Sequence, residues 1–344
     1  MATINISPAV LAAKIMAAPH APSRVAAEPA QPQPLGCATG DPAKGSDAAL
    51  PDSFETEAAM VQEDRLRARQ ARRVMNHPGP TNWVNLNDRL WLAKQQSQGV
   101  LATELNGGAI EALITKLEAG VETGQPALTL ASALRMRTIR MALGRAKLDA
   151  FAEYHDNDLR TVTVIYSGWA YTPATLDGVT ASQIKAQFIQ HLNRAGVTKM
   201  PGPLFAMLHG EFEASSGVFQ LHFHIITTKS KAAALLRLPK FVKGYTKTAT
   251  GACPVRRSPV RNRIRQFTYL AKAFWPGKPV VLIDGVPKRV HGYRRIPEPF
   301  GTQVLLWLDR QQLADLIVMN GCWSPRKGGT PAMRRLYLLA QGGG

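Results

Sequence analysis

The chain has 344 residues, which is enough for one large domain or for two ordinary domains with tails. Hydrophobic residues make up 45% of it, and no apolar run approaches the ~18 residues of a membrane span, which argues against a membrane protein. The net charge of +18, from 42 Lys and Arg against 24 Asp and Glu, favours a polyanionic partner, with nucleic acid as the leading class.

The N-terminal residues 1–60 are rich in Ala, Pro, Ser and Gly and show little periodicity. We expect a disordered leader there. The pattern from about residue 56 to 76 predicts a basic helix, and Pro78-Gly79-Pro80 then breaks it.

A basic, helical accessory region is expected over residues 61–154. The spacing of its apolar residues predicts helices at 109–119 and 129–154. The second helix has a basic face, which we expect to be solvated or to touch a phosphate backbone. That face consists of Arg135, Arg137, Arg140, Arg145 and Lys147.

The pattern changes from helical to alternating at residue 161. A β-branched strand is predicted over 161–166, followed by a helix over 180–195 with Thr180 or Ser182 as its cap. An antiparallel hairpin comes next. This order predicts an α+β fold with a central antiparallel sheet and flanking helices.

The hairpin, with arms at 204–213 and 218–228, carries the first chemical signal. Apolar and polar residues alternate along both arms, and residues 214–217 have the composition of a turn. Residues two apart on a strand point to the same face, so His222 and His224 project together. We expect this face of the sheet to be open to solvent.

The pairing of the two arms adds a carboxylate to this face. Across a two- or four-residue turn, His209 lies opposite His222, Glu211 lies one diagonal step from His222, and Glu213 lies at the turn. Two imidazoles and a carboxylate can hold a divalent cation with coordination sites left open. The alternative is a set of solvated or hydrogen-bonded histidines. Two related patterns fit worse, because the histidine-triad pattern needs a third His at Ile226, and the paired phosphodiesterases need two His-apolar-Thr tripeptides.

Positive charge is concentrated after the hairpin. Residues 229–295 hold 17 Lys and Arg against Asp284 alone. Residues 244–259, rich in Gly, Thr and Pro, are expected to form a mobile loop. The side chains expected to bind DNA are Lys240, Lys243, Arg256, Arg257, Arg261 and Arg265.

A helix predicted over 260–274 carries the second chemical signal. One of its faces presents Arg265, Tyr269 and Lys272, so a phenol lies among cations. Nearby positive charge favours the phenolate, which is the nucleophilic form of tyrosine. The alternative is a Tyr packed at the rim of the core.

The C-terminal part completes the predicted elements. Asp284-Gly285 predicts a tight hairpin turn between residues 279 and 293. A strand-like segment over 302–307, a helix over 309–320 and a basic, Gly-rich tail follow.

Three motifs in this order resemble the HUH endonuclease superfamily, and within it the single-tyrosine rolling-circle replication initiator (Rep) proteins of plasmids and phages. They are the strand Thr161-Val162-Thr163-Val164-Ile165, the tripeptide His222-Phe223-His224, and the nucleophile motif Tyr269-Leu270-Ala271-Lys272. The resemblance covers roughly 155–300, with 301–344 as an extension. It implies an HUH/Rep-like sheet of ferredoxin-like or RRM-like type.

The resemblance also implies a mechanism. Tyr269 attacks a phosphate of single-stranded origin DNA or an origin hairpin, stays linked to the 5′ end, and frees a 3′-OH that can prime a polymerase. Lys272 stabilises the transition state or assists proton transfer. Host helicase and polymerase are the implied partners, in a bacterial cytoplasm. The implied ligands of Mg²⁺ or Mn²⁺ are His222, His224 and either Glu211 or Glu213.

Three other functions remain open. A relaxase or transposase would use the same chemistry. A non-catalytic DNA-binding protein would need only the charge, and a hydrolase of small phosphates would need only the histidines. Cys37, Cys253 and Cys322 are too few and too far apart for a zinc module or a disulfide framework, which suits a reducing compartment.

Overall fold

The structure is a computed structural model in which the central sheet and its flanking helices share one hydrophobic core. Among the described residues, no helix is long and apolar enough to span a membrane. The predicted leader lies outside the described residues up to position 55, whereas residues 57–60 belong to the first helix. The structure describes residues 56–76, 105–213, 216–248, 252–272, 275–278, 280–283, 286–289, 295–326 and 328–342.

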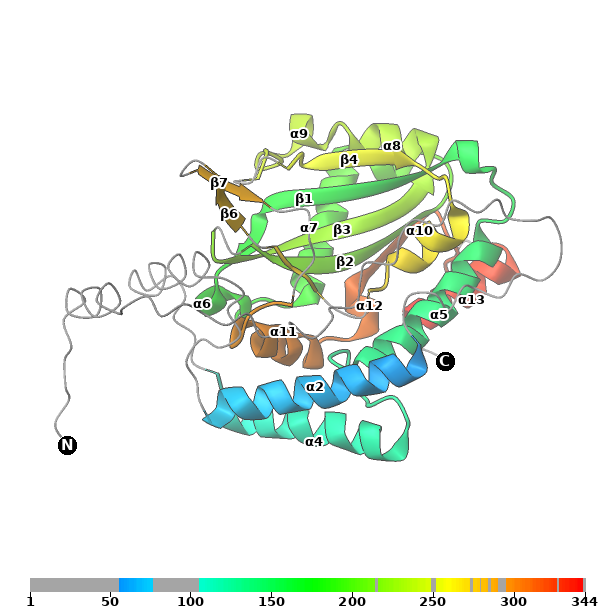
Figure 1. The fold of residues 1–344 in the computed structure, drawn as a ribbon. Helices are drawn as coiled ribbons and strands as arrows, with labels where there is room; N and C mark the ends of the chain where they lie inside the picture. Colours follow the sequence, from blue (N-terminus) through cyan, green and yellow to red (C-terminus); the bar gives the residue numbers. More distant parts are fainter. Residues whose placement is uncertain are drawn as a thin grey trace. The chain divides into compact units, whose positions relative to one another are not determined.

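A six-stranded sheet is the centre of the fold, as Figure 1 shows. The strand order is β4-β1-β3-β2-β5, and β8 also pairs with β2. All pairs are antiparallel except β2 with β5, which confirms the predicted α+β class with a central, mainly antiparallel sheet. The strands are β1 (Leu159–Tyr171), β2 (Leu204–Glu213), β3 (Val218–Thr228), β4 (Val255–Pro259), β5 (Gly277–Lys278) and β8 (Ile317–Asn320).

The β2–β3 hairpin has the predicted register. His209 pairs with His222, Glu211 with Gln220 and Glu213 with Val218. Opposite residues of an antiparallel pair project to the same face. One face of the sheet therefore carries the histidines, and we call it the histidine face.

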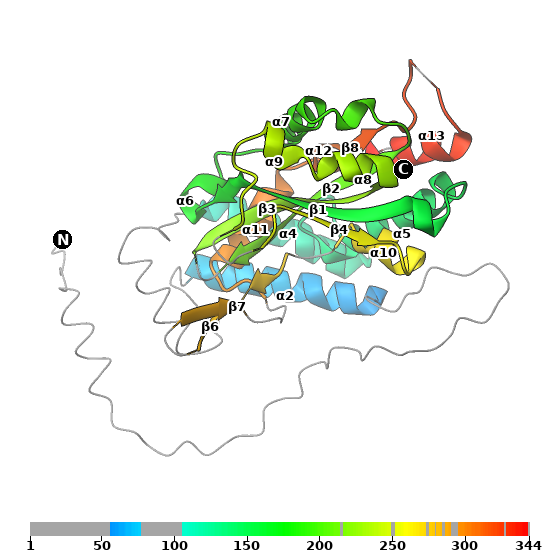
Figure 2. The same cartoon turned by 90° about the horizontal axis from the view of Figure 1, so that it is seen from above.

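The opposite face is covered by α7 (Ala181–Arg194), α8 (Lys229–Leu235) and α9 (Leu238–Phe241), which Figure 2 shows on one side of the sheet. The predicted cap of α7 is confirmed, because the Thr180 side chain accepts a hydrogen bond from the Gln183 amide. Phe188 of this helix stacks on Phe223 of β3 with ring centroids 4.2 Å apart. This packing is apolar.

Helices α5 (Ala133–Ala150) and α10 (Arg263–Tyr269) lie on the histidine side of the sheet, with α2 (Glu57–Asn76) and α4 (Gly107–Thr123) beyond them (Figure 2). The helices predicted at 56–76 and 109–119 are confirmed.

Helix α5 begins at Ala133, later than predicted, because Ser132 caps it and the carboxylate of Asp64 accepts a hydrogen bond from the Ala133 amide at 2.6 Å. Its basic face is not wholly solvated. Arg140 and Lys147 are buried, with 7% and 0% of their surface exposed.

Three predictions for the remaining segments are wrong in part. Residues 302–307 belong to a helix, α11 (Phe300–Asp309), because a short apolar run that is buried all round has no period that separates strand from helix. The predicted helix at 309–320 is a single turn followed by β8, which pairs with β2. The predicted mobile loop at 244–259 ends in β4, an edge strand hydrogen-bonded to β1.

The elements that complete the fold are short. The predicted pairing after residue 279 is confirmed by β6 and β7, while its turn, Asp284-Gly285, lies outside the described residues. The C-terminal tail contains a helix that was not predicted. These elements are η1 (Asp156–Asp158), α6 (Pro173–Leu176), η2 (Val197–Lys199), β6 (Val280–Ile283), β7 (Val286–Arg289), α12 (Leu313–Leu316) and α13 (Pro331–Ala340).

Candidate metal and nucleophile site

Three imidazoles converge on the histidine face. His209 on β2 and His222 and His224 on β3 each offer a ligand atom within 4.8 Å of the other two. The Nε2 atoms of His222 and His224 are 3.1 Å apart. The ring of His209 lies 5.5 Å from that of His222 and 5.7 Å from that of His224, between centroids. The three residues, called the histidine cluster below, could hold a metal ion.

Neighbouring groups orient two of these rings. The Nδ1 of His222 lies 3.3 Å from the carbonyl oxygen of Gln220, which can only accept a hydrogen bond. His222 therefore carries its proton on Nδ1 and keeps a lone pair on Nε2, the atom that faces His224. The Nδ1 of His224 lies 3.2 Å from the hydroxyl of Thr163 on β1, so its Nε2 also points into the cluster. Both rings thus present Nε2 to a shared point.

The prediction of an open sheet face is wrong at this position. His209 and His222 are buried, with 3% and 5% of their surface exposed, and His224 is partly buried. The ring of Trp275 lies 6.1 Å from that of His209, and the ring of Tyr269 lies 5.7 Å from that of His224. Elements later in the chain cover the face, which the sequence of the hairpin alone does not indicate.

Burial affects the protonation of the cluster. Burial lowers the pKa of His222 below its usual 6.5, although the negative charge of Glu211 opposes this shift. The pKa of His224 is lowered well below 6.5, first by burial and then by the positive charges of His222 and Lys272. Neutral imidazoles are the form that binds a metal ion.

The two carboxylates lie on the histidine face, Glu211 beside the cluster and Glu213 at the end of the hairpin. Glu211 and Glu213 are buried, with 9% and 2% of their surface exposed, and an oxygen of Glu211 lies 3.4 Å from the ammonium of Lys278. Glu211 is close enough for its charge to raise the pKa of His222. The third member of the cluster is His209, which the predicted register set opposite His222 without a role in metal binding.

Tyr269 and Lys272 lie next to the cluster. The Lys272 ammonium is 3.9 Å from the centre of the Tyr269 ring, which in turn contacts His224. The predicted helix is shorter than expected, since α10 ends at Tyr269 and Lys272 lies beyond its end. Tyr269, which is 36% exposed, therefore contacts both a cation and a candidate metal ligand.

The six predicted DNA-binding side chains are all exposed, but they lie on different sides of the sheet. Arg256 pairs with Thr163 and so projects to the histidine face, whereas Arg257 pairs with Val162 and projects to the opposite face. Arg265 lies in α10, on the histidine side, and Arg261 lies in the short segment between β4 and that helix. Lys240 in α9 and Lys243 after it belong to the other layer.

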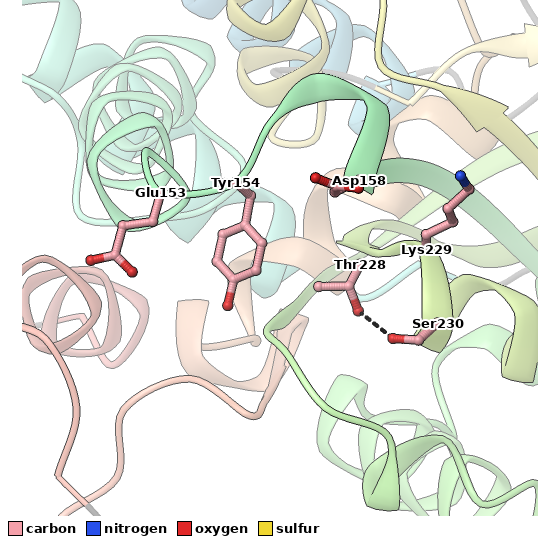
Figure 3. A pocket seen from close by; sticks show the side chains of 6 residues that line it. All are labelled: Glu153, Tyr154, Asp158, Thr228, Lys229 and Ser230. Atoms are coloured by element: carbon pink, nitrogen blue, oxygen red, sulfur yellow. Dashed lines mark hydrogen bonds between the residues drawn. The ribbon is translucent and has the colours of Figure 1, made fainter.

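A separate, open pocket of about 590 Å³ lies beyond the C-terminal end of β3 (Figure 3). The hydroxyls of Thr228 and Ser230 are 3.1 Å apart in it, and both contact the carbonyl of Pro201. Thr228 follows His224 by four positions, or roughly 13 Å along the strand. The pocket is thus distinct from the histidine cluster. It is lined by Glu153, Tyr154, Asp158, Thr228, Lys229 and Ser230.

Comparison with protein-family models, curated proteins and solved structures gives no match to this chain. The chemistry of the cluster and its neighbours is therefore the basis for a functional assignment.

Proposed function

We propose that the chain is an HUH-type endonuclease and strand transferase that nicks single-stranded DNA, in the role of a rolling-circle replication initiator. One observation carries the proposal: the Tyr269 ring lies 5.7 Å from His224, within a cluster of three histidines and beside Lys272. A tyrosine nucleophile, a set of metal ligands and a cation are the groups that this transesterification needs.

The donor atoms fit a divalent cation. Neutral imidazole nitrogens converge, and the tautomer of His222 leaves its Nε2 free to coordinate. A cation bound there would polarise the scissile phosphate and offset charge in the transition state. Because Mg²⁺ prefers oxygen ligands, three nitrogen donors favour Mn²⁺ as the better test ion.

Tyr269 performs the proposed bond exchange. Its phenolic oxygen forms a bond to phosphorus while the bond from phosphorus to the 3′ oxygen breaks. The phenolic proton leaves to solvent, and the 3′ oxygen gains a proton to become the free 3′-OH. The Lys272 ammonium, 3.9 Å from the ring centre, can stabilise negative charge on the phosphate.

The charge distribution supports a DNA substrate. Arg256 projects to the same face as the cluster, Arg265 belongs to the helix that carries Tyr269, and Arg261 lies just before that helix. Lys and Arg side chains around a reaction centre give salt-dependent binding of a phosphate backbone.

The test is cleavage of a 5′- or 3′-labelled single-stranded oligonucleotide in Mn²⁺, followed on denaturing gels. We expect a covalent protein–DNA adduct that requires the metal and disappears in Tyr269→Phe, while DNA affinity stays within about twofold. Tyr154→Phe is the matched control, since this tyrosine follows α5 and lies at the separate pocket. Adduct formation that persists in EDTA would refute the metal site. Adduct formation by Tyr269→Phe would show that another residue is the nucleophile.

A further inference from the structure

The nucleophile helix α10 is held by α5, the helix beside it in Figure 1. Helix α10 has 7 residues, and a helix this short is not stable without tertiary contacts. The position of its last residue, Tyr269, therefore depends on what holds the helix.

Two buried cations of α5 bind the C-terminal end of α10. The Arg140 Nε donates a hydrogen bond of 2.9 Å to the carbonyl of Thr268. The Lys147 ammonium donates to the carbonyl of Phe267 and lies 4.9 Å from the centre of the Phe205 ring on β2. The last carbonyls of a helix lack partners within it and carry partial negative charge, so cations satisfy and stabilise them.

The N-terminal end of α10 makes the reciprocal contact. Arg263, its first residue, donates to the carbonyls of Phe151 and Tyr154 that follow α5, and its Nε lies 2.7 Å from the Asp156 carboxylate. The rings of Phe151 and Phe267 meet edge to face at 5.5 Å between the two anchored ends. Both ends of α10 are thus bound to α5 or to the segment that follows it.

We infer that Arg140 and Lys147 are positioning residues that hold Tyr269 at the histidine cluster. The inference rests on the proposed function, because it gives a role to the position of the Tyr269 phenol. The carbonyl that Arg140 binds belongs to the residue immediately before Tyr269, so a shift of this contact moves the phenol directly.

Stability alone does not account for a cation at position 147. The side chain is fully buried, and burial lowers its pKa to about 7, so keeping a charge there is costly. A methionine of similar length would fill the same space without that cost, and replacing buried charges by apolar groups is often neutral or stabilising. The lysine offers what methionine lacks, a directed bond to one carbonyl of α10.

Helix α5, which binds α10, is itself hydrogen-bonded to the N-terminal helix α2. The Asp64 carboxylate of α2 accepts hydrogen bonds of 2.6 Å from both the Ser132 hydroxyl and the Ala133 amide at the start of α5. Arg67 of α2 donates to the Ala131 carbonyl at 2.6 Å. The helical region before the sheet is thereby connected to the nucleophile through α5.

The experiment compares Lys147→Met and Arg140→Met with Arg145→Met, which removes an exposed charge from the same helix. Each full-length protein is labelled with 3-fluorotyrosine, and the fluorine resonance of Tyr269 is assigned by its loss in Tyr269→Phe. The rate of adduct formation is measured at saturating oligonucleotide and Mn²⁺, with the affinity for Mn²⁺ measured separately.

We expect the Tyr269 resonance to shift or broaden in Lys147→Met and Arg140→Met and to stay unchanged in Arg145→Met. The adduct rate should fall about ten- to a hundredfold in the first two variants, because a misplacement of about 1 Å can cost that much. Affinity for Mn²⁺ should stay within about twofold, and Arg140→Lys, which keeps a donor, should recover most of the rate.

Unchanged Tyr269 resonances in both methionine variants would overturn the inference, whatever the activity. A wild-type protein that forms no adduct would refute the proposed function, and the resonances would still decide whether Arg140 and Lys147 set the position of Tyr269.

Discussion

Buried histidines occur on both sides of the sheet, in opposite settings. His191 on α7 donates to or accepts from the Tyr245 hydroxyl at 2.9 Å, and its ring stacks on Trp169 with centroids 6.0 Å apart. On the histidine face, His222 and His224 turn their Nε2 atoms toward each other at 3.1 Å. The first imidazole completes an aromatic core, whereas the other two direct their Nε2 atoms to a shared point.

The comparison shows that burial does not identify the function of a histidine. All of these side chains are shielded, and burial lowers the pKa of His191 as it does those of His222 and His224. The direction of the ring nitrogens separates the two settings. The His191 nitrogen meets a hydroxyl that satisfies it, whereas the Nε2 atoms of His222 and His224 meet each other, an arrangement that could hold a cation.

The largest effects should come from removing one histidine on each side of the sheet and comparing the loss of Mn²⁺ binding with the loss of stability. His209→Ala should weaken Mn²⁺ binding at least about a hundredfold, because it removes one member of the cluster. His191→Ala should leave Mn²⁺ binding unchanged but lower the free energy of unfolding by about 3 kcal/mol, because it leaves a cavity and strands the Tyr245 hydroxyl. Calorimetric titration measures the affinity for Mn²⁺, and urea unfolding measures the stability. A loss of Mn²⁺ affinity in His191→Ala would contradict the distinction between the two kinds of histidine.

The pH dependence of stability should identify His191 as a histidine that is buried neutral. Its pKa is lowered from 6.5 to about 4, first by burial and then by Arg194, while Tyr245 and Trp169 face it with groups that are uncharged in this range. Between these pH values the unfolded chain binds a proton that the folded chain does not. The free energy of unfolding should therefore fall as the pH falls from 6.5 to 4, by up to about 1.4 kcal/mol per pH unit.

The measurement is urea unfolding between pH 4.5 and 7 for the wild type and His191→Gln. Because both proteins contain the same histidine cluster, the difference between their slopes isolates His191. Parallel slopes would show that His191 is not held neutral by the fold.

On the histidine face, the two carboxylates should differ. Glu211→Gln should weaken Mn²⁺ binding about tenfold, because the negative charge of Glu211 acts on His222. Glu213→Gln should change it less than about threefold, since Glu213 lies at the end of the hairpin opposite Val218. Manganese titrations give the affinity of each variant. A larger loss of affinity in Glu213→Gln would show that Glu213, and not Glu211, is the carboxylate that supports metal binding.

The smallest effect concerns the edge strand. Arg256 projects to the histidine face and Arg257 to the other, so Arg256→Ala should weaken single-stranded DNA binding more, by a few-fold. The slope of log affinity against log salt should drop by about 0.7 for Arg256→Ala and less for Arg257→Ala. Fluorescence anisotropy between 50 and 300 mM salt gives both slopes. Equal losses of DNA affinity in the two variants would mean that DNA does not bind preferentially to the histidine face.

Local patterns predicted the parts of the fold that are determined locally. Alternation and turn composition gave the hairpin with its register, and the spacing around Ile184 and Phe188 gave α7. The burial of the histidine face could not be predicted, since Trp275 packs against His209 and Tyr269 against His224 from distant positions in the chain. The cluster's third histidine was located but not recognised, because a carboxylate on the same face offered an equally good ligand.

The basic face of α5 shows the same limit. Arg140 and Lys147 have the spacing of a solvated helix face. They are buried hydrogen-bond donors because α10 packs against them. Periodicity reports which residues share a face of a helix. It does not report what packs against that face.

The hairpin also has a consequence for the order in which the protein folds. All three imidazoles belong to β2 and β3, so one short loop closure brings them together. The contacts that hold α10 to α5 span 120 and 128 residues, so we expect them to form later. A cation that binds the hairpin would then stabilise the folding transition state as well as the native state. Manganese should accordingly accelerate refolding and leave the unfolding rate nearly unchanged.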